Sequence, residues 1–139
     1  MSEMRVTILP VLLFLFLAPA QDAVTGNKVD LGKEFVIRNG QEVTIRGEKL
    51  RIAFRSVTGD SRCPNGVTCV WAGNAAIKIE VSKKNKSFEG ATLNTTLEPK
   101  ELVYRGFKIK LVSLNPHPAS GVQIDPKDYC ATMIVSQDK

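Results

Sequence analysis

Apolar and polar side chains alternate along much of this chain. Residues 49–57, 74–82 and 128–136 place most of their large apolar side chains at every second position. Successive side chains point to opposite faces of a β-strand, so this period of two predicts strands with one buried face. Shorter or weaker segments of the same kind predict further strands: residues 34–38, 41–46, 88–97, 102–104 and 107–114. No segment has the 3.6-residue period of a long helix.

Turn residues separate these segments. Asn39-Gly40 lies between two of them, and this dipeptide is typical of a two-residue hairpin because both central residues of a type I′ turn need positive φ. The first three strands are therefore expected to form a meander. Arg105-Gly106 is expected to be a turn or a bulge. The apolar pattern changes phase near Val112, which predicts a bulge or a strand covered on both faces.

Seven or eight short strands with regular turn signals predict an all-β fold. We expect an antiparallel two-sheet sandwich, Ig-like or jelly-roll-like. A partly closed barrel is the alternative, because periodicity does not separate the two.

The first 20 residues differ from the rest. Arg5 precedes an apolar run of about a dozen residues that ends at Ala18-Pro19-Ala20, as in a secretory signal peptide. A permanent membrane span needs about 20 apolar residues, so none is expected after cleavage. Residues 21–33 are predicted to be a loose lead-in and residues 34–139 a single β domain, secreted or periplasmic.

The net charge of +5 is modest. No basic cluster is interleaved with aromatic residues, so nucleic acid is not expected as a partner. Lys83-Lys84-Asn85-Lys86 is interpreted as a solvated turn, with an acidic ligand as the alternative. Nothing in the pattern indicates an oligomeric state.

The least regular stretch is Asp60–Gly73, which contains two of the three cysteines. Pro64-Asn65-Gly66 between Cys63 and Cys69 can fold the chain back and bring the two thiols into disulfide range. A redox pair is the less favoured alternative, because the spacing is not Cys-x-x-Cys. Two thiols and one distant histidine do not complete a zinc site, so no metal is expected. Cys130 is interpreted as a small, partly buried residue, or as a bridge to another chain or to Cys63 or Cys69.

The candidate binding residues lie in this stretch, directly after it and in the 115–121 loop: Asp60, Arg62, Trp71, Asn74 and His117. Trp71 is interpreted as a core residue near the disulfide, with an exposed ligand platform as the alternative. Asp60 is expected to cap a turn, to pair with Arg62 or to bind a cation. Asn74 and the preceding glycine suggest a backbone with positive φ or a close approach. His117 lies between prolines and is expected to face solvent.

The chain also lacks a recognisable catalytic set. None of the sequence motifs of hydrolases, metalloproteases or nucleotide-binding enzymes occurs, so we expect neither catalysis nor a cofactor. Two triplets, at Asn85 and Asn94, match the glycosylation sequon and matter only in a eukaryotic host.

Two segments resemble a group of small, uncharacterised bacterial exported proteins. These segments are Asp60-Ser61-Arg62-Cys63-Pro64 with Cys69-Val70-Trp71-Ala72-Gly73-Asn74-Ala75, and Pro116-His117-Pro118 with Asp128-Tyr129-Cys130-Ala131. The resemblance covers most of the chain after the signal peptide. It implies an exported β domain with Cys63 and Cys69 paired, and it implies no activity. Cys130 is not part of the shared signature.

The function expected from these observations is binding of a protein or a cell-envelope component. The expected surface is the Asp60–Gly73 loop with the neighbouring 115–121 loop, since rigid β domains carry binding function on their loops. The alternative is an inhibitor of an extracytoplasmic enzyme such as a protease, with Arg62-Cys63-Pro64 presented as a pre-organised loop.

Overall fold

The computed structural model describes residues 27–139. The predicted signal peptide and the first part of the lead-in lie outside the described residues. The described part contains nine strands and one short 3₁₀ turn: β1 (Asn27–Val29), β2 (Glu34–Arg38), β3 (Glu42–Ile45), β4 (Leu50–Asp60), β5 (Ala75–Lys83), β6 (Glu89–Asn94), β7 (Glu101–Tyr104), β8 (Phe107–Asn115), η1 (Pro126–Asp128) and β9 (Cys130–Gln137). The fold is thus all-β, with nine described strands rather than the seven or eight expected.

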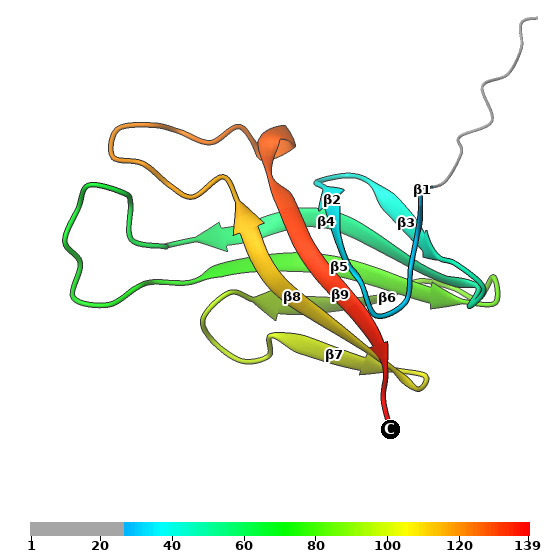
Figure 1. The fold of residues 1–139 in the computed structure, drawn as a ribbon. Helices are drawn as coiled ribbons and strands as arrows, with labels where there is room; N and C mark the ends of the chain where they lie inside the picture. The colour runs from blue at the N-terminus through cyan, green and yellow to red at the C-terminus, as the bar shows by residue number, and fades with distance from the viewer. Residues whose placement is uncertain (1–26) are drawn as a thin grey trace, which may run out of the picture.

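The strands form two sheets (Figure 1). One has five strands in the order β1-β3-β4-β5-β6, and the other has four in the order β2-β9-β8-β7. All neighbouring strands are antiparallel except β1 and β3, which are parallel.

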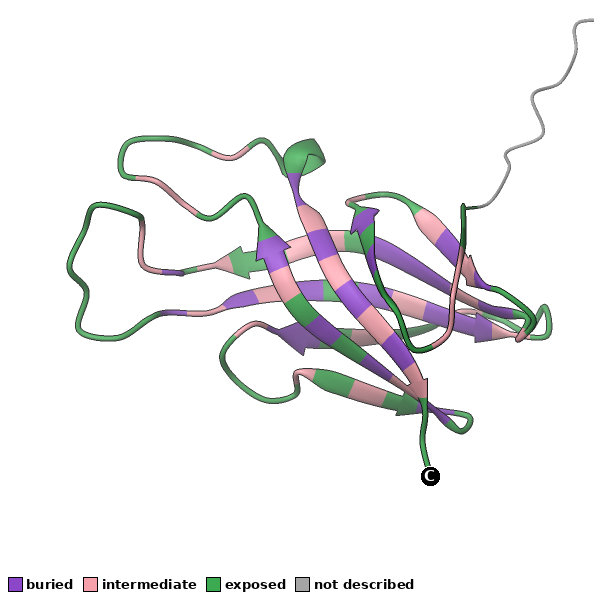
Figure 2. Cartoon of the chain, viewed as in Figure 1, coloured by how far each residue is buried: buried purple, intermediate pink, exposed green. Residues whose placement is uncertain are grey.

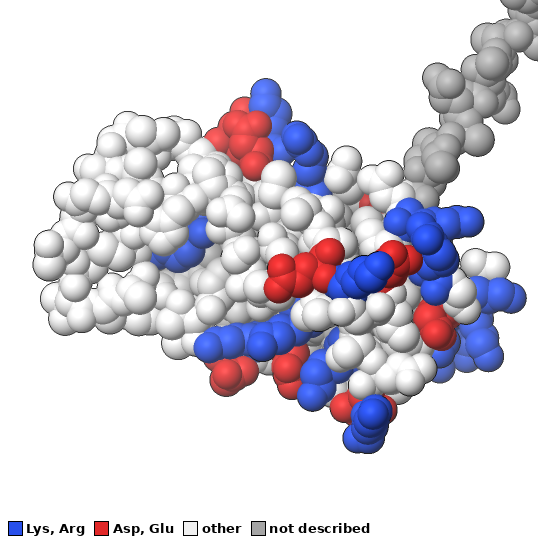
Figure 3. Space-filling view, viewed as in Figure 1, with Lys and Arg blue, Asp and Glu red and all other residues white. Residues whose placement is uncertain are grey.

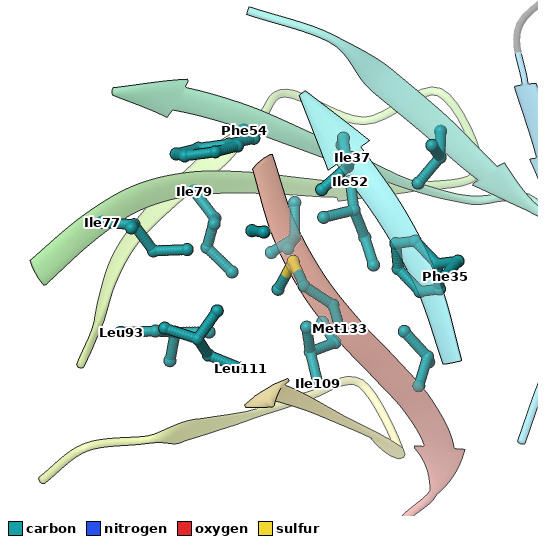
Figure 4. Packing of buried hydrophobic residues seen from close by; sticks show 14 of the residues in the cluster. Phe35, Ile37, Ile52, Phe54, Ile77, Ile79, Leu93, Ile109, Leu111 and Met133 are labelled. Atoms are coloured by element: carbon teal, nitrogen blue, oxygen red, sulfur yellow. The ribbon is translucent and has the colours of Figure 1, made fainter. Parts of the chain in front are cut away.

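Buried side chains from both sheets belong to one hydrophobic cluster (Figure 4). Along most strands, buried residues alternate with more exposed ones (Figure 2). Phe54, Ile79 and Met133, from three different strands, are completely buried. The alternation expected for residues 74–82 and 128–136 is therefore confirmed, because β5 and β9 each direct every second side chain into this cluster.

The expected hairpin at Asn39-Gly40 is wrong. β2 pairs with β9, whereas β3 pairs with β1 and β4, so the two strands belong to different sheets. Gly40 has φ +87° while Asn39 does not have positive φ, and the amide of Gln41 donates to the carbonyl of Arg38 at 2.9 Å. The turn thus carries the chain from one sheet to the other. Alternation shows which face of a strand is buried, but it does not identify the neighbouring strand.

Part of the expected lead-in is also structured. Residues 27–29 form β1, which pairs with β3, and Val29 and Leu31 pack against the core. Three residues are too few to show a period, which explains why the sequence pattern misses this strand.

Several local expectations are confirmed. Arg105-Gly106 is the turn between β7 and β8, with φ +47° and +82°. The pairing of β8 with β9 shifts register between Leu111 and Ser113, which accounts for the change of phase in the apolar pattern. No helix in the described part of the chain is long and apolar enough to cross a membrane.

Candidate functional site

Three strand connections lie at the same end of the molecule, on the left in Figure 1. They are the β4–β5 loop (61–74), the β6–β7 loop (95–100) and the β8–β9 connection (116–129). The candidate binding residues Asp60, Arg62, Trp71, Asn74 and His117 all lie in the β4–β5 and β8–β9 loops or where the strands meet them.

The base of the β4–β5 loop is held by a buried ion pair. The Arg62 side chain is only 7% exposed and the Asp60 side chain 11%. Arg62 Nε donates to Asp60 Oδ1 at 2.8 Å, and Arg62 Nη2 donates to Asp60 Oδ2 at 2.7 Å. Two parallel bonds of this kind are the strongest geometry for a guanidinium and a carboxylate. The Arg62 amide also donates to Asp60 Oδ1, at 3.3 Å, so Asp60 caps the turn as well as pairing with Arg62.

The same pair joins this loop to the β8–β9 connection. Arg62 Nη1 donates to the carbonyl of Leu114 at 2.5 Å, and Nη2 donates to the carbonyl of Pro116 at 2.9 Å. The hydroxyl of Tyr129 donates to Asp60 Oδ2 at 2.9 Å. Residues about 50 and 70 positions apart in the sequence are thus linked through one buried guanidinium and one carboxylate.

These contacts change the acidity of two groups. Burial alone would raise the pKa of Asp60, but hydrogen bonds from the Arg62 side chain, Tyr129 and the Arg62 amide, together with the positive charge of Arg62, lower that pKa below its ordinary value. Burial, reinforced by the hydrogen bond to the Asp60 carboxylate and its charge, raises the pKa of Tyr129. Asp60 therefore remains ionised and Tyr129 neutral, which is the state that their hydrogen bond requires.

The loop itself is closed by a disulfide. Cys63 and Cys69 are bonded, with their Cα atoms 5.9 Å apart. Beyond the disulfide, the amide of Asn65 donates to the carbonyl of Pro118 at 2.8 Å, which joins the two loops a second time. His117 Nε2 lies 2.8 Å from the carbonyl oxygen of Cys63, and since a carbonyl only accepts, this nitrogen carries the proton. His117 is exposed as expected, and this hydrogen bond joins it to the disulfide loop.

Gly73 allows the two arms of the loop to touch. Its φ is +73°, and a Cβ atom at this position would lie 1.9 Å from the carbonyl oxygen of Ser61. Ser61 and Asn74 exchange hydrogen bonds immediately beside it, with the amide of Ser61 donating to the carbonyl of Asn74 at 2.8 Å. The expectation of a close approach here is confirmed at Gly73.

Asn74 attaches the loop to the third connection. Its Nδ2 donates to Asn94 Oδ1 at 2.9 Å, and its Oδ1 accepts from the amides of Thr96 and Leu97 at 3.0 and 3.2 Å. All of these polar atoms have partners within the chain, so Asn74 positions the loop rather than offering a contact. Asn94 of the second sequon is itself buried.

Trp71 is not a core residue. It is 54% exposed, and its neighbour Val70 is completely exposed. The core interpretation is wrong because Trp71 lies in a loop, at residues 66–74 without strand structure, and is not part of the hydrophobic cluster. Val67 of the same loop and Val122 of the β8–β9 connection are also exposed. We call Val67, Val70, Trp71 and Val122 the apolar tip.

The end of the molecule that carries the apolar tip has very little charge. Residues 63–77 and 90–97 contain no charged residue, and residues 111–124 contain none besides the single His117. Figure 3 shows this end almost entirely white, whereas the Lys, Arg, Asp and Glu side chains in view lie mostly over the rest of the molecule. In a chain in which 24% of the residues are charged, three uncharged segments that meet at one end are the sequence signal that could have revealed this surface.

A shallow hollow lies beside the apolar tip. It has a volume of about 300 Å³ and is lined by residues of the β8–β9 connection together with the ion-pair carboxylate: Asp60, Pro118, Val122, Gln123, Ile124 and Tyr129. Because Asp60 is neutralised by Arg62, the hollow offers mainly apolar and uncharged polar contacts.

The structure thus divides the expected binding residues into two groups. Asp60, Arg62 and Asn74 lie at the base and hold the three connections together, while Trp71 projects into solvent. The expected presentation of Arg62 to a protease is wrong, because its guanidinium is buried and makes four hydrogen bonds, two to Asp60 and one each to the carbonyls of Leu114 and Pro116. Val67, Val70 and Val122 were not predicted as site residues.

Among residues 27–139, no group of three or more His, Cys, Asp or Glu side chains is placed to hold a metal ion. Comparison of the chain with family models, with curated proteins and with solved structures finds no match.

Proposed function

We propose that this chain is an exported binding module that recognises an uncharged surface of a protein or cell-envelope partner through the apolar tip. In this proposal the two sheets are the layers of a β-sandwich, and the sandwich serves as a rigid support for its loops. The observation that carries the proposal is the full exposure of Val70 next to a half-exposed Trp71, on a loop that a disulfide and a buried ion pair hold in place.

Exposure of these side chains has an energetic cost in water, which association would remove. Burying a large apolar side chain contributes about 1.5–3 kcal/mol, and tryptophan is among the residues most often found to dominate binding energy at interfaces. A partner that covered Trp71 and Val70 would gain this energy from two neighbouring residues.

The rigidity of the loop supports the same function. Ordering a flexible loop on binding costs free energy, and a loop fixed in advance avoids most of that cost. Here the disulfide, the Arg62–Asp60 pair and the Asn65–Pro118 hydrogen bond all restrict the loop before any partner arrives. These contacts leave the side chains of Val70 and Trp71 free.

The lack of charge indicates the kind of partner. A charged partner surface would lose hydration at the apolar tip without finding a counter-charge, which is unfavourable. An uncharged or apolar surface suits the tip better. The side chains here form no catalytic set of the kind that a nucleophile with an adjacent base would provide, so we propose binding rather than catalysis.

The test is capture of a partner by the immobilised chain from envelope extract and culture supernatant of the source cells. Trp71→Ser and Val70→Ser should each abolish capture of a partner that wild type retains. Both residues are exposed, so the free energy of unfolding of each variant should lie within about 0.5 kcal/mol of the wild-type value. Val103→Ser is the matched control, because Val103 is 53% exposed but lies on β7, away from the loops.

Equal capture by wild type and both tip variants would overturn the proposal. If the captured partner is a protease or another enzyme, stoichiometric inhibition that disappears with Trp71→Ser would identify the chain as an inhibitor. Such inhibition would depend on the apolar tip, since Arg62 is not accessible to a substrate cleft.

A further inference from the structure

The opposite end of the molecule carries a concentration of positive charge that the apolar tip does not use. Two strand turns meet there, the β5–β6 turn at residues 83–86 and the β7–β8 turn at Arg105-Gly106. Between them is a hollow of about 220 Å³ lined by Lys83, Lys84, Lys86 and Arg105, which we call the basic hollow. A second depression of about 440 Å³ adjoins it and adds Asn85, Ser87 and Glu89 to Lys86 and Arg105.

The hollow draws its cations from both sheets. Lys83 ends β5 of the five-stranded sheet, and Arg105 begins the turn after β7 of the four-stranded sheet. Lys83 Nζ lies 4.3 Å from the centre of the Phe107 ring, and the Arg105 guanidinium carbon lies 5.4 Å from that of Tyr104. These cation–π contacts restrict both side chains near the hollow.

The positive charge is poorly compensated. Within residues 27–139, none of the three lysines has a salt bridge, and Arg105 has only Glu89, at 3.7 Å and with both side chains about half exposed. An exposed pair at this distance contributes little. The hollow therefore has an excess of three positive charges over negative ones, and their mutual repulsion would be relieved by a bound anion.

The backbone adds a second, independent observation. Lys84 and Asn85 have φ +54° and +59°, and the amide of Lys86 donates to the carbonyl of Lys83 at 3.2 Å, so the turn is of type I′. Arg105 and Gly106 likewise both have positive φ. Type I′ turns favour asparagine or glycine at the first central position, and a long side chain is strained there. Turn geometry thus does not account for a cation at this position in both turns, and such outliers gather at functional sites.

We propose that the basic hollow is a binding site for phosphate groups. An arginine fork and several lysines are the side chains that bind phosphate oxygens best, and Asn85 and Ser87 supply uncharged donors at the rim. The phosphate can belong to a small molecule or to the headgroup of an anionic lipid, and the two sources share this chemistry. The site is separate from the apolar tip, because the β5–β6 and β7–β8 turns lie at the end of the molecule away from the β4–β5 and β8–β9 loops (Figure 1).

The variants Lys84→Asn and Arg105→Asn test the site without disturbing the fold. Each removes one charge and introduces the residue that a type I′ turn prefers, so each variant should be at least as stable as wild type. Lys127→Asn is the control, because Lys127 is 78% exposed on η1 and its removal lowers the net charge equally.

Binding is measured in two arms at low ionic strength. Inorganic pyrophosphate is titrated by calorimetry, and vesicles containing phosphatidylglycerol in phosphatidylcholine are used in cosedimentation. In whichever arm wild type binds, each hollow variant should weaken binding by about 10-fold or more, the double variant should abolish it, and Lys127→Asn should leave it within about twofold. Binding should also weaken as salt is raised, because ions screen exposed charges.

If wild type binds pyrophosphate and the hollow variants lose that binding, the ligand is a small phosphate compound. If wild type binds only the vesicles and the hollow variants lose that binding, the ligand is a lipid headgroup. The absence of binding in both arms would overturn the proposal. So would binding that Lys84→Asn and Arg105→Asn leave unchanged, or that Lys127→Asn reduces equally. Trp71→Ser should bind pyrophosphate like wild type, so a failure of the proposed tip function would leave this result unaffected.

Discussion

Arg62 is the residue on which the loop end of the molecule depends. It lies in the β4–β5 loop, yet its guanidinium donates to two carbonyls of the β8–β9 region and to the Asp60 carboxylate. A buried ion pair of this kind contributes specificity more than net stability, but removal of one partner leaves an uncompensated charge. The conformation of the β4–β5 loop therefore depends on the ion pair, and the ion pair forms only in that conformation.

We predict that Arg62→Met destabilises the fold by about 3–5 kcal/mol, measured by urea unfolding. The Asp60 carboxylate would remain buried with only the Tyr129 hydroxyl and one amide as donors. Unchanged stability would contradict the role assigned to this ion pair.

The same pair predicts how stability depends on pH. The folded-state pKa of Asp60 lies below its ordinary value of 3.8. Its ionised form is thus favoured by folding, and the resulting stability is fully present above the ordinary pKa and lost as the pH falls through the folded pKa. In Asp60→Asn this acid-dependent part of the free energy of unfolding should disappear. Asp128→Asn, a control at an exposed residue, should retain it.

The alternating pattern and the spacing of Cys63 and Cys69 predicted the strands and the disulfide, but nothing in the sequence predicted that Trp71 points outward and Arg62 inward. A tryptophan is usually buried and an arginine usually exposed, and both tendencies fail here. Arg62 is buried because backbone carbonyls of a distant loop complete its hydrogen bonds. Contacts between residues 50 positions apart leave no periodic trace in the sequence, so no local pattern could reveal them.

At the scale of the elements, the disulfide loop is held from three directions. The Cys63–Cys69 bond closes its tip, the amide of Cys63 pairs with the carbonyl of Ala72 across its arms, and Asn74 ties its end to the β6–β7 loop. The disulfide is therefore one restraint among several.

We predict that the double variant Cys63→Ser/Cys69→Ser remains folded but loses about 2–2.5 kcal/mol, as expected for opening so short a cross-linked loop. Urea unfolding would measure the loss. Capture of a partner by the apolar tip should weaken as well, because the loop would need ordering on binding. Cys130→Ser, at a free and half-buried thiol on β9, should change neither property. Global unfolding of the double variant would show that the remaining contacts cannot hold the loop.

Strand positions were predictable where a long strand lies over the core, as for β5 and β9, because burial of one face imposes the period of two. Pairing partners were not predictable in the same way. Asn39-Gly40 has the composition of a hairpin turn but joins strands of different sheets. β2 pairs instead with β9 and β3 with β4, and both strands bury their apolar faces in the one shared core, so burial alone does not tell the two arrangements apart.

At the scale of the whole molecule, the two ends have opposite chemistry. The end with the apolar tip has almost no charge, and the other carries the basic hollow. Figure 3 shows the charged side chains concentrated away from the loop end. If both proposals hold, one end would hold the molecule to phosphate groups while the other remained free to contact an uncharged partner.

The position of the single tryptophan leads to a prediction about global unfolding. Both sheets share one hydrophobic cluster, so the domain should unfold in one cooperative transition. Trp71 lies outside that cluster and is already 54% exposed. Its fluorescence in the folded protein should therefore resemble that of a solvated indole and be quenched readily by acrylamide.

The emission maximum of Trp71 should shift little on unfolding in urea, while circular dichroism reports the full loss of β-structure over the same range. The nearby disulfide remains intact in the unfolded chain, so its effect on the indole is present in both states. A strongly blue-shifted native emission that moves to the red together with the circular dichroism would show that Trp71 is buried. In that case the apolar tip would lose its central residue, and the binding function proposed for this end of the molecule would have to be abandoned.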